Sequence, residues 1–271
     1  MPENNDASSG ARLNEESRAA WNDNAATWDT AREGGIAFQD VLTEPVILRL
    51  LGPVDGLAIV DAGCGNGHFP RTLADLGAQV MAFDFADELI ARARSRSASY
   101  GDRIAYSVID ATDAAQLATL PAGAFDAVTS SGVLMTMTGI EPLIAAAHRW
   151  LKPDGVFVFS VSHPCFNTDK TVLVAESVQG PPGEWRTIRS VKVWGYKSAV
   201  PTRSGNVKGQ TLLQVYVDRP LEVLLGAFFA NGFVMEAIEE PAFPEDPTAP
   251  LLDWRGMSEI PGVFAARMRR V

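Results

Sequence analysis

The distribution of apolar and polar residues changes along the chain, and each pattern predicts a different kind of structure. The first 13 residues are small and polar without periodicity, which is typical of a disordered terminus. Apolar residues then recur at helical spacing as far as Leu51, and the pair Gly34-Gly35 divides this stretch into two helical segments. The sequence therefore predicts a disordered tail over 1–13 and a helical cap over 14–51.

After Gly52-Pro53, short apolar runs alternate with amphipathic segments. This alternation is typical of a parallel sheet with crossover helices, in which strands covered on both faces are apolar throughout. The predicted strands are 57–62, 79–84, 104–109, 125–130 and 155–161, with helices near 67–76, 87–98, 112–118 and 140–152. These elements define a predicted cofactor-binding core over 52–162.

The regular alternation stops at residue 163 and returns only near residue 219. The segment 163–218 is rich in glycine, proline and β-branched residues, and it is too long for a bare loop in a compact domain. We therefore expect an insertion with its own hairpin, covering the active site. A helix at 219–231 and strands at 233–238 and 262–268 complete the core sheet within 219–271. The predicted fold class is α/β, a doubly wound, mostly parallel sheet of seven strands whose last strand is antiparallel.

Composition and charge exclude several classes of protein. The 271 residues are 46% hydrophobic, which is typical of a folded globular chain. A formal net charge of −10 argues against nucleic acid as a partner. Only two cysteines occur, and no segment has the length and apolarity of a membrane span, so we expect a cytoplasmic protein that does not enter membranes.

The most informative segment follows the first predicted strand and reads Asp61-Ala62-Gly63-Cys64-Gly65-Asn66-Gly67. Glycines allow a tight turn and close approach of a ligand to the backbone, at the sheet edge where α/β proteins bind ligands. The spacing G-x-G-x-G differs from the G-x-G-x-x-G of nicotinamide and flavin sites and from the phosphate loop of nucleotide hydrolases. A tight turn without a ligand is the alternative interpretation.

Two further carboxylates end the second and third predicted strands. Asp84 is placed to accept hydrogen bonds from both ribose hydroxyls of a nucleoside. Asp110, followed by Ala111, is placed to accept one from an exocyclic adenine amine. Either aspartate could instead cap only its own strand end. The three strand ends together suit a nucleoside with a small zwitterionic tail.

With the glycine loop, Asp84, Asp110 and the sequence Leu151-Lys152-Pro153-Asp154-Gly155, the chain resembles the class I S-adenosylmethionine-dependent methyltransferases. Within them it is similar to the small-molecule enzymes related to the ubiquinone and menaquinone C-methyltransferases. The resemblance implies S-adenosyl-L-methionine as cofactor and a small-molecule acceptor of its methyl group on oxygen, nitrogen or carbon.

The resemblance also implies which residues contact the cofactor. It assigns the methionine end to Asp61 and the loop, the ribose to Asp84, and the adenine to Asp110 and Ala111, with Trp28 as part of a lid. The predicted cofactor-binding residues are Asp61, Gly63, Cys64, Gly65, Asn66, Gly67, Asp84, Phe85, Asp110, Ala111, Ser130 and Trp28.

The acceptor side is less defined by the sequence. His163 follows the fifth predicted strand, and its ordinary pKa suits proton removal; lining the pocket and stabilising a turn are the alternatives. No metal is predicted, because no cluster of metal-ligating residues is apparent. Two other functions remain open: non-methyl chemistry on the same cofactor, and binding by a catalytically inactive protein.

The insertion suggests a character for the acceptor. Six basic residues stand against one acid between Glu184 and Lys208, beside Trp185, Trp194 and Tyr196. If these side chains face the site, they would attract an anionic, planar molecule. The alternative is a solvated hairpin face.

Overall fold

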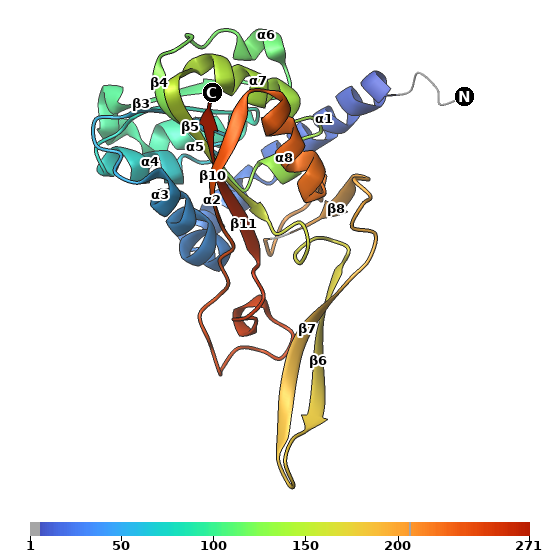
Figure 1. Ribbon diagram of the computed structural model, residues 1–271. Helices are drawn as coiled ribbons and strands as arrows, with labels where there is room; N and C mark the ends of the chain where they lie inside the picture. The colour runs from blue at the N-terminus through green and yellow to red at the C-terminus, as the bar shows by residue number, and fades with distance from the viewer. Residues whose placement is uncertain (1–5, 206) are drawn as a thin grey trace.

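The structure is a computed structural model that describes residues 6–205 and 207–271. Its central element is a seven-stranded sheet with the strand order β10-β11-β5-β4-β1-β2-β3 (Figure 1). Strands β1 to β5 pair in parallel, and β11 runs antiparallel to both β5 and β10. The predicted fold class, a doubly wound sheet whose last strand is antiparallel, is confirmed.

The strands of this sheet lie where the apolar runs predicted them. They are β1 (Ala58–Ala62), β2 (Gln79–Asp84), β3 (Ile104–Val108), β4 (Phe125–Ser131), β5 (Leu151–Ser162), β10 (Phe233–Glu239) and β11 (Val263–Arg270). Strand β5 begins four residues before the predicted start, because Leu151 already pairs with Phe125 ahead of an irregularity in the register.

Helices cover both faces of the sheet, which explains why its inner strands are almost wholly apolar. On one face lie α3 (Glu44–Leu51), α4 (His68–Asp75) and α5 (Asp87–Arg96). On the other lie α6 (Ala114–Leu117), α7 (Glu141–Trp150) and α8 (Leu221–Ala230). Short helical turns occur at η1 (Phe38–Thr43), η2 (Ala98–Arg103), η3 (Leu134–Thr136) and η4 (Trp254–Gly256).

The N-terminal cap consists of α1 (Asp6–Asp23) and α2 (Ala25–Glu33). Gly34-Gly35 divides the helical stretch as predicted, but α3, which was expected to belong to the cap, packs on the sheet. The expected disordered tail is wrong for residues 6–13, which belong to α1; residues 1–5 lie outside the described part. The helix is held at Asn14 and Arg18, whose side chains both donate to the Asp110 carboxylate. No proline interrupts residues 6–13, so the anchored helix continues toward the N-terminus.

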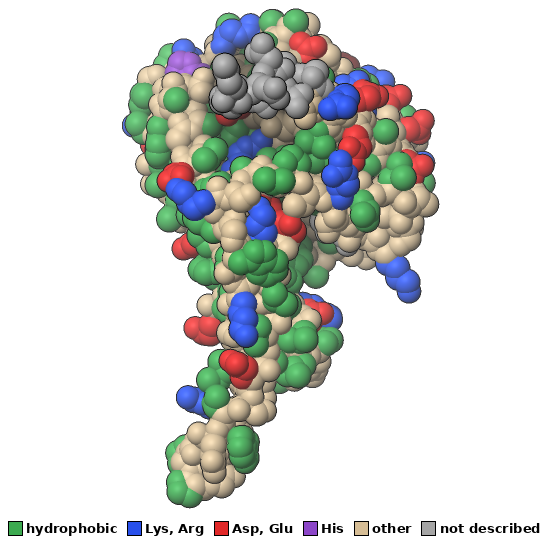
Figure 2. Space-filling view, turned by 90° about the vertical axis from the view of Figure 1, so that its right-hand side faces the viewer, with side chains coloured by type: hydrophobic (Ala, Val, Ile, Leu, Met, Phe, Trp, Pro, Cys, Tyr) green, Lys and Arg blue, Asp and Glu red, His purple; other side chains and the backbone are tan. Residues whose placement is uncertain are grey.

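The insertion has two parts that behave differently. Strands β6 (Thr171–Gln179) and β7 (Trp185–Val193) form a hairpin that projects from the body as an arm (Figures 1 and 2). Strands β8 (Thr202–Ser204) and β9 (Gln214–Tyr216) instead lie against the cap. There Arg203 pairs with Glu16, and the Asn24 side chain donates to the Leu212 carbonyl. Of these two strand pairs, β8–β9 is the one that lies near the carboxyl ends of the strands in the central sheet.

Within residues 6–205 and 207–271, no helix is both long enough and apolar enough to cross a bilayer.

Candidate active site

The glycine loop connects β1 to α4 at the carboxyl edge of the sheet. Gly63, Gly65 and Gly67 all have positive φ values, of 77°, 55° and 76°. A Cβ atom at Gly63 would come within 2.5 Å of the Val133 side chain, and one at Gly67 would collide with the Tyr106 hydroxyl. Glycine is therefore required at both positions by conformation and by space.

Asp84 ends β2 beside this loop and is only 8% exposed. Its carboxylate accepts hydrogen bonds from the backbone N–H groups of Gly65 and Ala86, at 3.0 and 2.9 Å. Burial raises the pKa of Asp84, against the opposing effect of the backbone N–H groups of Ala86, Gly65 and Phe85. The side chain is thus fixed in position while it still lines a cavity.

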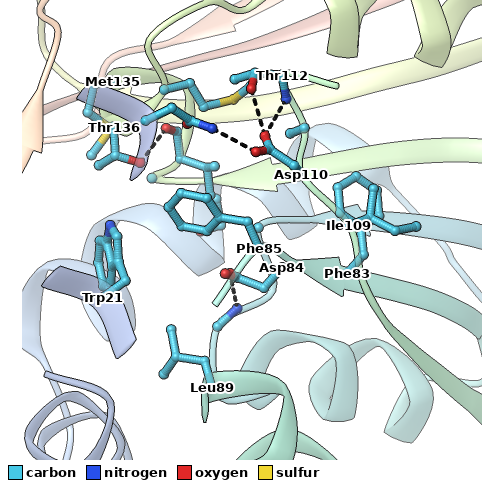
Figure 3. A pocket seen from close by; sticks show the side chains of 18 of the residues that line it. Trp21, Phe83, Asp84, Phe85, Leu89, Ile109, Asp110, Thr112, Met135 and Thr136 are labelled. Atoms are coloured by element: carbon cyan, nitrogen blue, oxygen red, sulfur yellow. Dashed lines mark hydrogen bonds between the residues drawn. The ribbon is translucent and has the colours of Figure 1, made fainter. Parts of the chain in front are cut away.

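Asp110 follows β3 and has both carboxylate oxygens fully engaged. One oxygen accepts from the Asn14 amide and the Arg18 guanidinium at 2.6 and 2.7 Å, and the other from the Thr112 backbone and hydroxyl at 2.8 and 2.7 Å (Figure 3). A carboxylate has about four lone-pair positions, so these donors saturate it. In this arrangement a further donor reaches Asp110 only if the cap withdraws one of its own.

These groups surround a cavity of about 870 Å³, counting its open mouth. Among the predicted cofactor residues, those that line it are Trp28, Gly63, Gly65, Asp84, Phe85, Asp110 and Ala111. The predicted residues outside its lining are Asp61, Cys64, Asn66, Gly67 and Ser130. The apolar part of the wall includes Met137 together with Trp21, Leu89 and Met135; Figure 3 shows the last three around Phe85. The cavity thus combines a polar floor with aromatic and thioether walls.

Three of the remaining predicted residues are buried away from the cavity. Burial raises the pKa of Asp61 to about 7, against the hydrogen bond from the Thr129 hydroxyl at 2.6 Å. Burial likewise raises the pKa of the Cys64 thiol, which makes it an inert packing group. The Ser130 hydroxyl is buried without a hydrogen-bond partner among the described residues.

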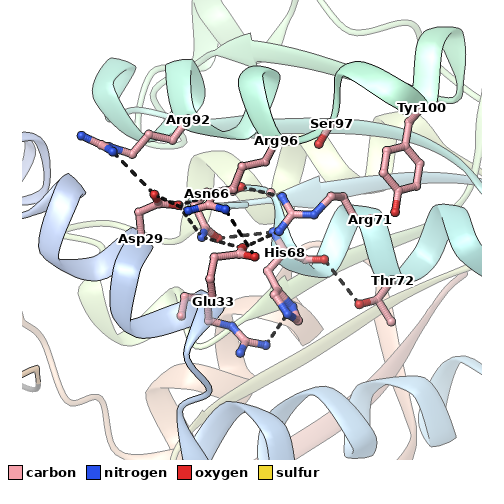
Figure 4. A network of polar contacts seen from close by, with 12 residues as sticks. Asp29, Glu33, Asn66, His68, Arg71, Thr72, Arg92, Arg96, Ser97 and Tyr100 are labelled. Carbon is pink, nitrogen blue, oxygen red and sulfur yellow. Dashed lines mark hydrogen bonds and ion pairs between the residues drawn. The ribbon is translucent and has the colours of Figure 1, made fainter.

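Asn66 joins the loop to the cap rather than to the cavity (Figure 4). Its amide donates to Asp29 at 2.9 Å, and Asp29 also receives a bidentate pair of hydrogen bonds from Arg96 at 2.7 and 2.8 Å. Glu33 of α2 pairs with Arg71 of α4 in the same network. The network fixes α2, and with it Trp28, over the glycine loop.

His163 lies apart from the cavity. It is 1% exposed, and burial lowers its pKa despite the nearby Glu240 carboxylate. Its Nδ1 accepts from the Cys165 backbone at 3.1 Å, so Nε2 carries the proton and donates to Glu240 at 2.8 Å. Because both ring nitrogens are engaged and His163 lines none of the described cavities, this geometry gives it no access to an acceptor.

A second cavity, of about 1130 Å³ with its mouth, adjoins the first. The two share the lining residues Trp28, Gln39, Gly132, Met135 and Tyr216. Its wall also contains Asp169 and Asp218, and burial together with the Asp169 carboxyl raises the pKa of Asp218 to about 7. Sequence reasoning did not assign this pair a role. The available signal was a carboxylate directly before Arg219-Pro220.

The charge of the two cavities is uniform. Asp84, Asp110, Asp169 and Asp218 line them, and within the described part of the chain their lining contains no lysine, arginine or histidine. In the same ranges, no group of three or more histidine, cysteine or acidic residues is arranged to hold a metal ion. The site is therefore acidic and apolar.

Comparison with known proteins gives a consistent result. A family described as "Methyltransferase domain" matches residues 60–159. A ubiquinone biosynthesis O-methyltransferase of Xanthomonas axonopodis pv. citri is 39% identical over 105 residues, 39% of this chain and 43% of the relative. The chain thus spans about half the length of the curated relatives it matches.

Solved structures match over more of the chain. An S-adenosylmethionine-dependent methyltransferase from Mesorhizobium loti, 27% identical, covers 88% of this chain and 99% of its own with a TM-score of 0.62. A Burkholderia thailandensis 1,6-didemethyltoxoflavin-N1-methyltransferase shares the fold at 15% identity, over 100% of this chain and 92% of its own, with a TM-score of 0.58. The resemblance to the class I S-adenosylmethionine-dependent methyltransferases is confirmed.

Proposed function

From the methyltransferase domain at residues 60–159, we propose that this protein transfers a methyl group from S-adenosyl-L-methionine to a small-molecule acceptor. The observation that carries the proposal is the cavity at the glycine loop, which is lined by Asp84 and Asp110 and adjoins a second cavity. One cavity suits a nucleoside, and the other has room for a second reactant.

The residues present fit this cofactor. The glycine loop leaves space that a Cβ atom would fill, and Asp84 has carboxylate lone pairs available for ribose hydroxyls beyond the two backbone donors it accepts. Asp110 would meet the adenine only after Asn14 or Arg18 releases it. Bound there, the cofactor supplies a methyl group on a positively charged sulfur. Acidic lining favours such a cation.

The residues of the chain orient and enclose the reactants. Trp28 of α2 and Met135 of η3 line both cavities, where they would contact both reactants. Methyl transfer is an in-line displacement, for which positioning supplies much of the rate acceleration. We assign His163 no role in methyl transfer, because both of its ring nitrogens are already engaged in hydrogen bonds.

The acceptor we propose is planar and partly apolar. Aromatic side chains of Phe38 and Trp254 in the second cavity support this character. The expectation of an anionic acceptor has no such support, because the basic residues of the hairpin lie outside both linings. Trp185 and Trp194, which were expected to stack on the acceptor, are 68% and 53% exposed.

Incubation of the protein with S-adenosylmethionine and a metabolite extract tests the proposal. We expect extract-dependent release of S-adenosylhomocysteine, together with incorporation of labelled methyl into a small molecule. Tight binding without release would instead favour a binding protein, and consumption of the cofactor without methylated product would favour non-methyl chemistry.

A further inference from the structure

The second cavity adjoins the first. The five residues common to both linings include Trp28 from the cap, Met135 from η3 and Tyr216 from β9. A molecule in the second cavity therefore lies against residues that also line the first. An acceptor bound in the second cavity during the proposed reaction would contact the residues that line it.

Asp218 is held firmly at this wall by its two neighbours in sequence. The Val217 backbone donates to the Met135 carbonyl at 2.7 Å. The Arg219 guanidinium donates to the carbonyls of Leu134 and Met137 at 2.9 and 2.8 Å. Residues 135–137 also line the first cavity, so Asp218 is fixed relative to both spaces, as an efficient catalytic group requires.

The charged groups around Asp218 make it an unusual carboxylate. Asp169 and Asp218 both line the second cavity and lie close enough to interact, and the cations Lys170 and Arg219 also interact with Asp218. Burial, followed by the Asp169 carboxyl, raises the pKa of Asp218 to about 7, against the Asp169 backbone N–H and Lys170. Near neutral pH such a group exchanges protons readily, whereas an ordinary aspartate is a much weaker base.

Two other polar atoms in the same wall lack partners. Gln39 Oε1 and Thr202 Oγ1 are buried without a hydrogen-bond partner among the described residues, although both residues line the second cavity. These atoms add polar character to the wall, and Phe38 and Trp254 give the same cavity an apolar, aromatic surface.

We propose that Asp218, assisted by Asp169, is the general base for an acceptor that carries an O–H or N–H proton. This inference rests on the proposed function. The acceptor atom forms its bond to the methyl carbon as the carbon–sulfur bond breaks, and the electron pair of that bond stays on sulfur. The acceptor proton passes to a carboxylate oxygen of Asp218, and the deeply buried His163 takes no part.

The first test compares Asp218→Asn with a matched control, Asp102→Asn, at an exposed carboxylate away from both cavities. The acceptor is the extract fraction that supports S-adenosylhomocysteine release by the parent. We expect Asp218→Asn to lower that rate at pH 7 at least a hundredfold, while its calorimetric affinity for S-adenosylhomocysteine stays within twofold of the parent value. The control should match the parent in both measurements.

A second variant, Asp169→Asn, keeps the proposal testable if Asp218→Asn does not fold. Removing the neighbouring negative charge should lower the pKa of Asp218, so the rising limb of the pH–rate profile should move to lower pH. Infrared titration of the protein alone gives a readout without turnover. In the parent, a carboxyl should titrate near neutral pH, and in Asp169→Asn the same carboxyl should titrate at lower pH; the signal of Asp61, common to both proteins, cancels in the difference between them.

The outcomes separate the two proposals. If the parent releases no S-adenosylhomocysteine with any fraction, the proposed function fails and this inference fails with it. If the parent is active and Asp218→Asn retains a rate within threefold, only the general-base assignment is overturned. An unmoved pH limb in Asp169→Asn would overturn it as well, because a merely structural carboxylate leaves that limb in place.

Discussion

The N-terminal cap and the hairpin of the insertion are both additions to the same sheet, yet only the cap takes part in the candidate site. The cap contacts the core through paired charges: Asp29 with Arg96, and Glu33 with Arg71. The hairpin is also rich in charge, but Arg189 reaches only the Gly256 carbonyl of the body. Whether the cap or the hairpin covers the site therefore depends on complementary charged groups on the core, and not on how many charges the segment itself carries.

The largest effect in this comparison is expected at Asp84, in the part of the site that the cap covers. Asp84→Ala should weaken S-adenosylhomocysteine binding more than tenfold, because ribose hydroxyls lose a charged acceptor contributing about 1.5–3 kcal/mol per bond. The Gly65 N–H also loses its partner. Calorimetry measures the change, with Asp102→Ala as an exposed control. An unchanged dissociation constant in a folded Asp84→Ala protein would refute the assignment of this residue.

The second test disconnects the cap. Asp29→Ala removes the bidentate contact of Arg96 and the contact of Asn66. We expect a loss of about 1–2 kcal/mol in the free energy of unfolding, reduced from the value of a fully buried pair because Arg96 is partly exposed. Denaturant titration measures it. Asp253→Ala, which removes a bidentate contact of exposed Arg255, should cost less than about 0.5 kcal/mol; equal losses would contradict the comparison.

The same contact predicts a pH dependence. Burial opposes ionisation of Asp29, but the hydrogen bonds of Arg96 and Asn66 hold its pKa below the ordinary value. Its contribution to stability is therefore complete above the unfolded-state pKa of about 3.9. That contribution disappears as the pH falls through the lowered folded-state pKa. The stability difference between parent and Asp29→Ala should accordingly shrink on acidification below about pH 4, and a constant difference would show that the carboxylate charge is irrelevant.

A smaller effect is expected where the cap meets Asp110. Asn14→Ala frees one lone pair of that carboxylate, which becomes available to an adenine amine. Affinity for S-adenosylhomocysteine should rise about two- to fivefold, roughly the value of one net hydrogen bond. Calorimetry beside an Asn22→Ala control, which alters α1 at its contact with Asp87, measures it. Weaker binding by Asn14→Ala would show that Asn14 itself holds the ligand.

The smallest effect is expected in the hairpin. Reversal of Arg186 and Arg189 to Glu should leave KM and its salt dependence within twofold of the parent, because neither residue lines a cavity and charges in solvent are screened over about 10 Å. Kinetics across a salt series in a folded variant measure it. A raised KM with weaker salt dependence would instead support an anionic acceptor and show that the hairpin contributes to the site.

The sheet was predictable because its determinants are local in sequence. Apolar runs, the glycine spacing and the terminal Asp84 each mark one strand end, and parallel strands bring those ends to one edge. The cap contact at Asn14 was not predictable, because it joins residues 96 positions apart. The Asp169–Asp218 pair depends in the same way on how the insertion folds back, while the engagement of His163 requires Glu240 from a distant segment.

The acidic lining of the two cavities also bears on how a catalytic cycle ends. In the proposed reaction the sulfur is cationic before methyl transfer and neutral afterwards, while Asp84, Asp110 and Asp169 still line the cavities and Asp218 has taken the acceptor proton. Attraction between lining and ligand is therefore strongest before transfer and falls when the charge on sulfur disappears. The carboxylates that favour binding of the cationic cofactor therefore attract the neutral product less strongly. The charge of the lining thus favours release of the product.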